Sequence, residues 1–421
     1  MTRRVAIVGA GIKAPGGCDV ATFWQTQFSG RTQAAPTEFE NLEALSAAPI
    51  ACTIPVPVEE GDYFARSEAR RMDPATRFGA AAAIDAIASA DARAVLESVE
   101  PQRRACVVGT GVGGLRTYEE QATIDRTSGV MRVSPFTVPM VMPNALTGWL
   151  TVNLDLQGSS STIALACASS TASIGEAMHL IRAGRADVVL AGGMEHTVWR
   201  RLIGSFGRME ALSTWPGDPS GASRPFSADR CGFVMGEGGA MFVLAAEETA
   251  RAAGATILGW IDGFGGSSDA HHMVAPLENG AGAAASMRNA LDDAGLTSDQ
   301  IGHVNAHGTS TPRNDDAESQ AIMSVFGDHR PPVTATKGIT GHLIGGSGAV
   351  EALATLLAAS TGQCPPVANT VEKDPAIEAD IVIGEARTLP QGSPSISNSF
   401  AFGGHNATLV ISPGDVAPLL S

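Results

Sequence analysis

The most constraining feature of this chain is a short stretch in which a strand pattern passes directly into a helical one. Residues 159–165, Ser-Ser-Ser-Thr-Ile-Ala-Leu, end in β-branched and apolar residues among small ones, which predicts a short buried strand. From Ser169 onward, apolar residues recur at helical spacing, namely Ala172, Ile174, Ala177, Met178 and Ile181. This pattern ends at Gly184. Cys167 therefore lies where a strand ends and a helix begins.

That position makes Cys167 a candidate nucleophile. The free amides and the positive dipole end of a helix favour an anion, so we expect them to lower the pKa of the thiol and raise the thiolate fraction. A cysteine among Ala and Ser residues is also compatible with a small core residue. Cys167 alone does not decide between these interpretations, and two histidine motifs downstream favour the first.

Length and apolar patterning limit the fold and the cellular setting. A chain of 421 residues can hold two or three domains or one large α/β unit, and its 48 glycines suit a compact fold with many tight turns. The apolar run after the basic N-terminus is too short for a signal peptide, and no uninterrupted apolar stretch could span a bilayer. We therefore expect a soluble, cytoplasmic protein with no membrane partner.

Charge and cysteine usage exclude further classes. The formal net charge is −15 and no run of Lys or Arg offsets it, which argues against a nucleic-acid partner. The six cysteines lack the spacing of a zinc site or a disulfide framework, which indicates a reducing compartment and no metal site. They are Cys18, Cys52, Cys106, Cys167, Cys231 and Cys364.

Strand and helix patterns alternate along the chain and begin again near Gly254. The similar order of elements predicts a duplicated α/β unit, with one half over residues 1–253 and the other over residues 254–421. Within the first half, Asp73 is expected to cap a buried helix that extends to Ala90.

Two other regions of the first half are expected to be loops or turns. The segment from Gly30 to about Val58 is rich in Ala, Pro and Glu and is interpreted as a loop. Glycine turns at residues 9–17 and 109–114 lack the spacing of a dinucleotide site or a phosphate loop, so neither cofactor is indicated.

Three further motifs place polar side chains in turns. A Val-Asn-Ala-His-Gly-Thr-Ser-Thr-Pro motif delivers His307 from a short strand into a turn of hydroxyl residues. Lys337 and His342 share one glycine-rich loop, with Glu351 on the helix that follows. A Ser-Asn-Ser-Phe-Ala-Phe-Gly-Gly motif begins at Ser397 and can present backbone amides to a ligand. Each motif alone is weak, because a lone histidine is more often a structural residue.

In order and content, these motifs resemble those of the β-ketoacyl-[acyl-carrier-protein] synthases, the condensing enzymes of the thiolase fold. The resemblance runs from about Val5 to Ile411 and implies a thiolase-like α/β fold with a five-layered αβαβα core. The matching positions imply a catalytic set made of the nucleophile Cys167, the histidines His307 and His342, the lysine Lys337 and the acid Glu351.

The resemblance also implies a reaction. Cys167 would take an acyl group from an acyl carrier protein, and the backbone amides of Cys167 and Phe402 would form an oxyanion hole, worth about 3 kcal/mol per donor. The two histidines would then stabilise the enolate left when malonyl-acyl carrier protein loses its carboxylate. The product would be 3-oxoacyl-acyl carrier protein, and no metal or organic cofactor is implied.

Further positions follow only from the resemblance. Thr309 and Thr311 match residues that bind the pantetheine arm, and Phe400 matches the gate between the acyl pocket and the active site. The acyl pocket and the loop beside the gate would include Val112, Phe206 and His272. The family docks its acidic carrier protein where this chain has Arg66, Arg70 and Arg71. Such a cluster can also be plain solvated surface.

Several positions depart from the common fatty-acid elongating enzymes. They are Ser159 in place of a proline, Ser169-Ser170-Thr171 after the nucleophile, Glu210 where an arginine is usual, and His405 where threonine is common. The opening residues look closer to polyketide ketosynthases. We therefore expect a ketosynthase of type II polyketide or specialised fatty-acid biosynthesis, with a primary fatty-acid elongating enzyme as the alternative.

Two rival functions fit the sequence less well. A thiolase would want a second catalytic cysteine in the last motif, where this chain has Phe402 and His405. A non-catalytic chain-length-factor subunit would lack the nucleophile. The apolar segment 138–154 has the character of an interface, so we expect a homodimer or a heterodimer with a chain-length-factor-like subunit.

Overall fold

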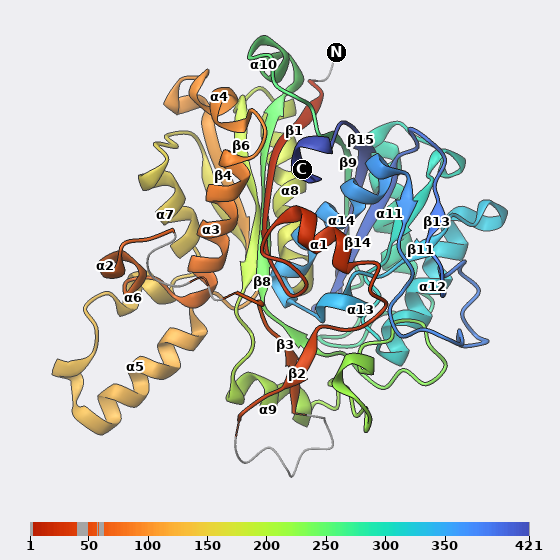
Figure 1. Cartoon of the computed structure of the whole chain (residues 1–421), viewed down its shortest axis with the longest axis horizontal. Helices are drawn as coiled ribbons and strands as arrows, with labels where there is room; N and C mark the ends of the chain where they lie inside the picture. The colour runs from red at the N-terminus through yellow and green to blue at the C-terminus, as the bar shows by residue number, and fades with distance from the viewer. Residues whose placement is uncertain (1–2, 40–48, 57, 59–62, 421) are drawn as a thin grey trace.

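The computed structural model describes residues 3–39, 49–56, 58 and 63–420 of the chain. Within these residues, ten strands form one mixed sheet, and the layers of the molecule follow the order αβαβα (Figure 1). The predicted α/β class with a five-layered core is confirmed. From one edge to the other, the strands are β11 (Val333–Thr334), β10 (His303–Asn305), β14 (Ser395–Ala401), β15 (His405–Pro413), β9 (Gly259–Ser268), β1 (Val5–Lys13), β8 (Gly238–Ala246), β6 (Val188–Glu195), β4 (Arg104–Gly109) and β5 (Ser160–Ile163).

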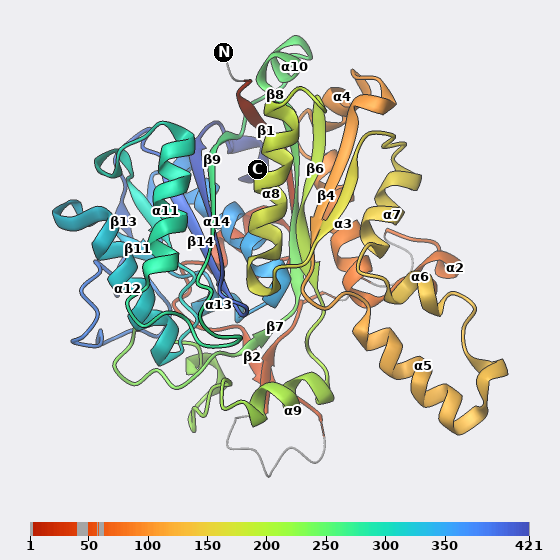
Figure 2. The same ribbon diagram turned by 180° about the vertical axis from the view of Figure 1, so that it is seen from behind.

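The sheet is bent into two halves that enclose a pair of helices. β1 pairs with β8 from Val5 to Lys13, but with β9 only from Val5 to Ile7, so the halves join at one end. Between them lie α8 (Ser169–Arg182) and α14 (Ser347–Thr361), which contact strands of both halves (Figure 2). The outer layers are α3 (Pro74–Ala88) and α7 (Ala145–Asn153) over one half, and α11 (Ala281–Ala294) and α12 (Pro312–Phe326) over the other.

The remaining described elements surround this core. The helices are α1 (Val20–Thr26), α2 (Arg66–Ala69), α4 (Ala92–Glu97), α5 (Leu115–Ser128), α6 (Thr137–Val141), α9 (Arg200–Arg208), α10 (Glu247–Ala252), α13 (Lys337–Thr340) and α15 (Ala417–Leu420). The strands are β2 (Ala34–Pro36), β3 (Ile50–Cys52), β7 (Met235–Gly236), β12 (Gln363–Cys364) and β13 (Arg387–Thr388). The predicted boundary at residues 253 and 254 falls between α10 and β9.

α14 is buried on every side because it belongs to the middle layer. Its residues from Ser347 to Ala359 are all buried, and Leu353, Leu356 and Leu357 join a core cluster that includes residues of both sheet halves. A helix with a polar face could not occupy this position. Fully burying each leucine contributes roughly 1.5–3 kcal/mol, so the middle layer is a main source of stability.

The N-terminal ends of α8 and α14 are in close contact. A Cβ atom at Gly348 would lie 2.0 Å from Thr171 Oγ1, so glycine is needed for this approach. The Ser170 hydroxyl accepts a hydrogen bond from the first turn of α14 at 2.9 Å. Because Cys167 precedes α8 and His342 precedes α14, this contact brings two of the sequence motifs together.

The predicted helix that begins after Asp73 is observed as α3. The Asp73 side chain caps it by accepting a hydrogen bond from the backbone N–H of Ala75 at 2.9 Å, and Pro74 occupies the first turn. The same carboxylate accepts hydrogen bonds from the backbone and hydroxyl of Thr117, which joins α3 to α5.

The prediction of a loop from Gly30 to about Val58 was wrong in part. β2 and β3 form antiparallel pairs with each other, and β3 pairs in parallel with β7. The partner strand β7 lies about 180 residues downstream of β3, so local composition carried no signal for this small sheet. Residues 40–48 and 57 of the predicted loop lie outside the described residues.

The strand before Cys167 was predicted as buried, and this was also wrong. β5 forms the edge of the large sheet, pairing only with β4 among the described strands. Ser160 and Ser161 are exposed, and Thr162 and Ile163 are half-buried. Because this strand is at an edge, its outer hydrogen-bonding groups are available to another chain.

Exposed apolar side chains are frequent on α5, α6, α7 and the segments that connect them. α5 projects from the body of the protein, and α6 and α7 lie between it and the sheet (Figure 2). Large apolar residues of this region that are at least 38% exposed include Leu115, Val130, Met131, Phe136, Val138, Met142 and Val152. No helix in the described part of the chain combines the length and apolar composition that a membrane span needs.

Candidate active site

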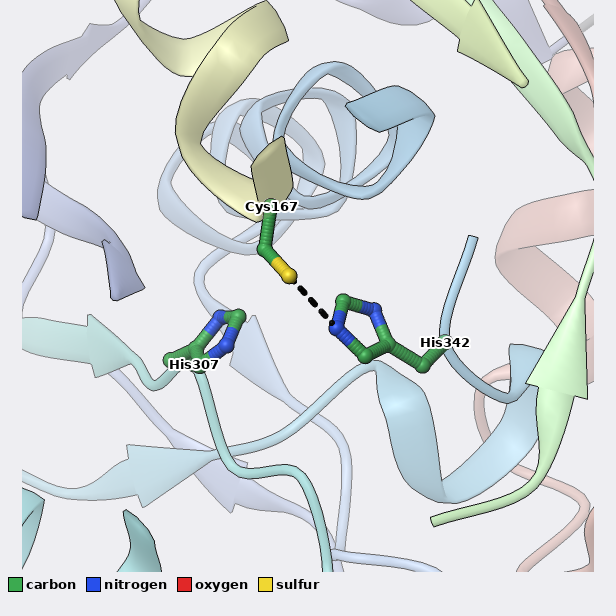
Figure 3. Close-up of side chains that lie close together, drawn as sticks. All are labelled: Cys167, His307 and His342. Atoms are coloured by element: carbon green, nitrogen blue, oxygen red, sulfur yellow. Dashed lines mark hydrogen bonds between the residues drawn. The ribbon is translucent and has the colours of Figure 1, made fainter. Parts of the chain in front are cut away.

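Cys167 lies in a single 3-10 turn, Ala166–Ala168, between β5 and α8. The preceding residue, Ala166, has a φ of +46°, a left-handed conformation that costs an alanine energy. The Ser169 hydroxyl holds this turn by accepting from the backbone N–H of Leu165 and donating to the carbonyl of Ala166. The turn points the Cys167 thiol away from the helix and toward two imidazoles (Figure 3).

His342 is held with its Nε2 atom 3.1 Å from the Cys167 sulfur (Figure 3). Its Nδ1 atom accepts a hydrogen bond from the backbone N–H of Ile344 at 3.2 Å and lies 3.0 Å from the Ser347 hydroxyl. A neutral imidazole that accepts at Nδ1 carries its proton on Nε2. His342 therefore donates an N–H toward the sulfur.

His307 is held in the same tautomer by a different donor. It follows β10, and its Nδ1 atom lies 3.0 Å from the ammonium of Lys337, which can only donate. Its proton is therefore on Nε2 as well. The rings of His307 and His342 are 5.4 Å apart and nearly perpendicular, so two N–H donors face one space beside Cys167.

Lys337 forms a buried ion pair with Glu351 of α14. The Lys337 ammonium also donates to the carbonyl oxygen of His307 at 2.8 Å, so all three of its protons are used. Burial raises the pKa of Glu351 to about 7, and the charge of Lys337 opposes that shift. Removing either partner would leave a buried charge uncompensated, which costs about 3–5 kcal/mol.

Both imidazoles are neutral in this environment. Burial lowers the pKa of His307 and His342 well below the usual value, and the nearby Lys337 charge lowers both further. The histidines therefore act as hydrogen-bond donors through Nε2 and not as cations.

The expected lowering of the thiol pKa is contradicted. Burial raises the pKa of Cys167 to about 12, although the Lys337 charge and a hydrogen bond involving the Phe402 backbone both oppose the increase. The sequence argument considered only the start of α8, whereas the thiol is 5% exposed. Loss of solvation disfavours the thiolate, so Cys167 rests as a thiol.

A cavity of about 570 Å³ leads to these groups. Both histidines line it, together with Phe400 and Phe402 of the last motif. The Phe400 ring lies 6.0 Å from that of His307, where it can obstruct the path to the thiol. Other predicted residues that line the cavity are Phe206, Thr309, Thr311 and Glu210.

The remaining predicted residues lie outside the cavity lining. The backbone N–H of Val112 donates to Glu195, and the exposed His272 accepts from two backbone N–H groups of its own loop. The loop of His272 still neighbours the last motif, because the carbonyl of Met273 accepts from the backbone N–H of Gly403. The arginine cluster Arg66, Arg70 and Arg71 lies on and after α2, where Arg71 stacks on the ring of Phe136 at 4.3 Å.

Several residues that shape the site were missed in the sequence. Glu318 of α12 accepts hydrogen bonds from the backbone N–H groups of His307 and Gly308, both at 2.8 Å. Asp315, one turn earlier, accepts from the backbone of Thr309 and Phe226. Acids three residues apart on a helix normally indicate a solvent-exposed face. Only the burial of Asp315 and Glu318, which the sequence does not show, distinguishes them from such surface acids.

The sulfur of Cys167 and one ring nitrogen from each histidine lie within 4.8 Å of one another, a spacing that a metal ion could use. However, the donors at both Nδ1 atoms place a proton on each Nε2, where a metal ion would need a lone pair. The absence of a metal requirement stays a prediction.

Two family models match the chain. The one described as Beta-ketoacyl synthase, N-terminal domain, matches residues 2–250, and the one described as Beta-ketoacyl synthase, C-terminal domain, matches residues 258–371. Among curated proteins, the chain is similar to 3-oxoacyl-[acyl-carrier-protein] synthase 2 of Synechocystis sp., with 38% identity over 413 residues, which is 97% of each chain.

Solved structures with the same fold include two ketosynthase assemblies. The ishigamide ketosynthase/chain length factor superimposes with a TM-score of 0.89 and 32% identity, covering 99% of this chain and 100% of that one. A type II polyketide synthase acyl-carrier protein in complex with its ketosynthase bound to the hexaketide superimposes with a TM-score of 0.88 and 25% identity, covering 98% and 100%.

The raised pKa of Cys167 predicts how its alkylation depends on pH. The rate of modification by iodoacetamide, followed by mass spectrometry of the Cys167 peptide, should still be increasing at pH 9, because only the thiolate reacts and burial disfavours it. Free cysteine in the same tube provides the reference. A rate that is already constant below pH 8 would contradict the resting thiol.

Proposed function

The chain belongs to the β-ketoacyl synthase family and is a condensing acyltransferase, and we propose that its site joins an acyl group held on Cys167 to malonyl-acyl carrier protein, giving 3-oxoacyl-acyl carrier protein. The observation that carries this assignment is the pair of neutral imidazoles, His307 and His342, which both present an Nε2–H to the space beside the Cys167 sulfur. Such a pair suits the stabilisation of an oxyanion next to an acylated cysteine.

The first step is acyl transfer. The Cys167 sulfur attacks the thioester carbonyl, and the thiol proton leaves with the pantetheine thiol that is released. His342 donates to the sulfur as its charge develops, which offsets part of the cost of forming a thiolate in a buried site. The backbone amides of Cys167 and Phe402 are proposed to hold the tetrahedral oxyanion, at about 3 kcal/mol per donor.

The second step is decarboxylation. When malonyl thioester loses CO2, the electrons of the broken carbon–carbon bond form an enolate, whose oxygen needs hydrogen-bond donors. His307 and His342 supply two, and neither has to lose a proton, since both rings are neutral with Nε2 protonated. Lys337 keeps His307 in this tautomer.

The third step forms the new carbon–carbon bond. The enolate carbon attacks the acyl-Cys167 carbonyl, and the thiolate of Cys167 leaves and recovers a proton from solvent in the cavity. Electrons and protons balance in all three steps without a redox partner or an electrophilic metal. We therefore propose that no metal or organic cofactor takes part.

An acyl carrier protein is the proposed partner. Thr309 and Thr311 line the cavity, and their hydroxyls, 2.8 Å apart, can bond the amides of a pantetheine arm. The arginines of the cluster Arg66, Arg70 and Arg71 suit an acidic carrier in an otherwise acidic chain. The solved ketosynthase with 25% identity is described in complex with its acyl-carrier protein.

The pathway is proposed to be type II polyketide or specialised fatty-acid synthesis, and primary fatty-acid elongation is the second candidate. The solved ketosynthases favour the first, and the 38% identity to a 3-oxoacyl synthase 2 favours the second. The unusual residues after the nucleophile say little about which pathway is correct, because they bond within the core and do not face the cavity. The Ser170 hydroxyl bonds to the backbone of α14, and the Thr171 hydroxyl bonds to Ser399. Glu210 does line the cavity, so it can influence which substrate enters.

Association with a second chain is proposed from the open edge of β5 and the exposed apolar residues beside it. Val152 of α7 is 83% exposed, and α7 contacts β5. Exposed apolar side chains near an unpaired strand edge are typical of an interface. The partner is a second copy or a chain-length-factor-like subunit.

Variants of the catalytic set should separate acyl transfer from decarboxylation. Cys167→Ala should abolish covalent acylation from acyl carrier protein, measured as a mass increase of the enzyme. His307→Ala should still acylate but should lose about 100-fold or more of its release of CO2 from malonyl-acyl carrier protein. His179→Ala, at an exposed histidine, is the control. Acylation of the Cys167→Ala protein would contradict the assignment of the nucleophile.

Reversing the charge of Arg70 and Arg71 should show whether the arginine cluster docks the carrier protein. Arg70→Glu with Arg71→Glu should lower kcat/KM for acyl-acyl carrier protein by about tenfold and weaken its salt dependence, because steering acts through exposed charge. Turnover of an N-acetylcysteamine thioester should change little. Arg93→Glu, at an exposed arginine of α4, is the matched control. Equal losses with both substrates would indicate a folding defect in place of a docking defect.

Interface variants should reveal the assembly. The chain, alone or co-expressed with a chain-length-factor-like subunit, should form a dimer by light scattering, and Val152→Asp should dissociate it because a charge would be buried. Val371→Asp places the same charge at a valine that is 88% exposed on another part of the surface and should leave the dimer intact. An active monomer of the unaltered chain would overturn both dimer proposals.

A further inference from the structure

Glu195, the last residue of β6, is a fully buried acid with an unusual set of partners. No Lys, Arg or His in the described part of the chain forms an ion pair with it. A buried carboxylate without a cation is costly unless hydrogen bonds replace the lost water. The hydrogen bonds of Glu195 therefore determine which segments of the chain it holds together.

Four donors from two loops meet this carboxylate. Its Oε1 atom accepts from the Thr110 hydroxyl at 2.8 Å and the backbone N–H of Val112 at 3.3 Å. Its Oε2 atom accepts from the backbone N–H of Gly111 at 2.5 Å and from that of Gly345 at 3.1 Å. The first three donors belong to the loop after β4, and the fourth belongs to the turn after His342.

The two loops approach each other so closely that only glycine fits at residues 111 and 345. A Cβ atom would lie 2.8 Å from Glu195 Oε2 at Gly111 and 2.5 Å from it at Gly345. A Cβ atom at Gly345 would also lie 2.3 Å from the backbone nitrogen of Gly111. The loops are therefore in direct contact, and the carboxylate bridges them at the point of closest approach.

The turn that Glu195 holds is strained and contacts His342. Ile344 has a φ of +48°, which a β-branched residue rarely adopts and which persists only when its surroundings enforce it. Its backbone N–H donates to His342 Nδ1 and so sets the tautomer of that ring. The bond from the next residue, Gly345, to Glu195 is one of the contacts that keeps this turn in place.

We propose that Glu195 is a positioning residue for the condensation, whose carboxylate fastens the Val112 loop to the Ile344–Gly345 turn and thereby keeps the His342 Nε2–H directed at the Cys167 sulfur. This inference rests on the proposed role of His342 as a donor. It predicts that the loop after β4 and the orientation of His342 are mechanically linked, because the Glu195 carboxylate bonds both to that loop and to the turn after His342.

Glutamine at this position tests the proposal with little change in shape. The Glu195→Gln amide would turn an NH2 group toward at least one backbone N–H, because every backbone partner is a donor. Asp73→Asn is the matched control, since Asp73 is also fully buried and accepts from two backbone N–H groups and a hydroxyl, but joins α3 to α5. Both variants should lower Tm.

Two measurements distinguish positioning from stability alone. In Glu195→Gln, kcat for CO2 release from malonyl-acyl carrier protein should fall about tenfold with KM changed less than twofold, whereas Asp73→Asn should retain the unaltered kcat. In 15N-histidine-labelled protein, His342, assigned with a His342→Asn variant, should lose its Nε2–H tautomer signature in Glu195→Gln only. His307, held by Lys337, should keep its signature and serves as the internal reference.

A Glu195→Gln protein with lowered Tm but with the unaltered kcat and His342 spectrum would overturn the proposal and leave Glu195 a purely structural residue. If the unaltered enzyme released no CO2 from malonyl-acyl carrier protein, the proposed function would fail instead. The histidine spectra would then still decide whether Glu195 holds the His342 turn.

Discussion

The chemistry of this protein depends on one buried ammonium, that of Lys337. It donates to the carboxylate of Glu351, to the carbonyl of His307 and to His307 Nδ1, so its charge is compensated and its protons are used. Bringing these ions out of water costs several kcal/mol each, which their mutual attraction and hydrogen bonds must offset. Burial makes both histidines neutral, and the ammonium charge lowers their pKa further. The ammonium also directs the proton of His307 to Nε2.

The architecture places this ammonium beside a nucleophile from the other half of the chain. α8 and α14 form the middle layer, and their N-terminal ends touch through Gly348 and Thr171. Cys167 lies just before α8, His342 lies just before α14, and Glu351 lies on α14. Because α14 is buried on all sides, its charged residue Glu351 has no access to bulk water, and its interaction with Lys337 is poorly screened.

Acids around the site are held largely by backbone amides. Glu318 accepts from two amides of the His307 turn, and Glu195 accepts from three amides of the Val112 and Gly345 loops. Burial raises the pKa of each to about 7, although these hydrogen bonds favour the ionised forms. Fixed amide dipoles thus replace solvent around these two buried acids, and the same hydrogen bonds hold the turns that carry His307 and follow His342.

The sequence by itself determined the features that depend on neighbouring residues. Periodicity and capping act over a few residues, so the sequence could predict three local features. They are the helix after Ser169, the Asp73 cap and the strand before His307. The motifs that carry Cys167, His307, Lys337, His342 and Glu351 were also legible, through their resemblance to a known family. The family matches confirm that resemblance.

Only the tertiary structure decided the properties that depend on residues far apart in the chain. His342 and Cys167 are 175 positions apart, yet the fold brings them into contact. The burial of Cys167 in this assembled site raises its thiol pKa, in the direction opposite to the local prediction. β5 was misjudged because its composition suits a core strand, while its place in the sheet is an edge. Desolvation and strand order both depend on residues that are far apart in the sequence. Strand order placed β5 at an edge, and desolvation made the correctly located Cys167 a resting thiol beside two neutral donors.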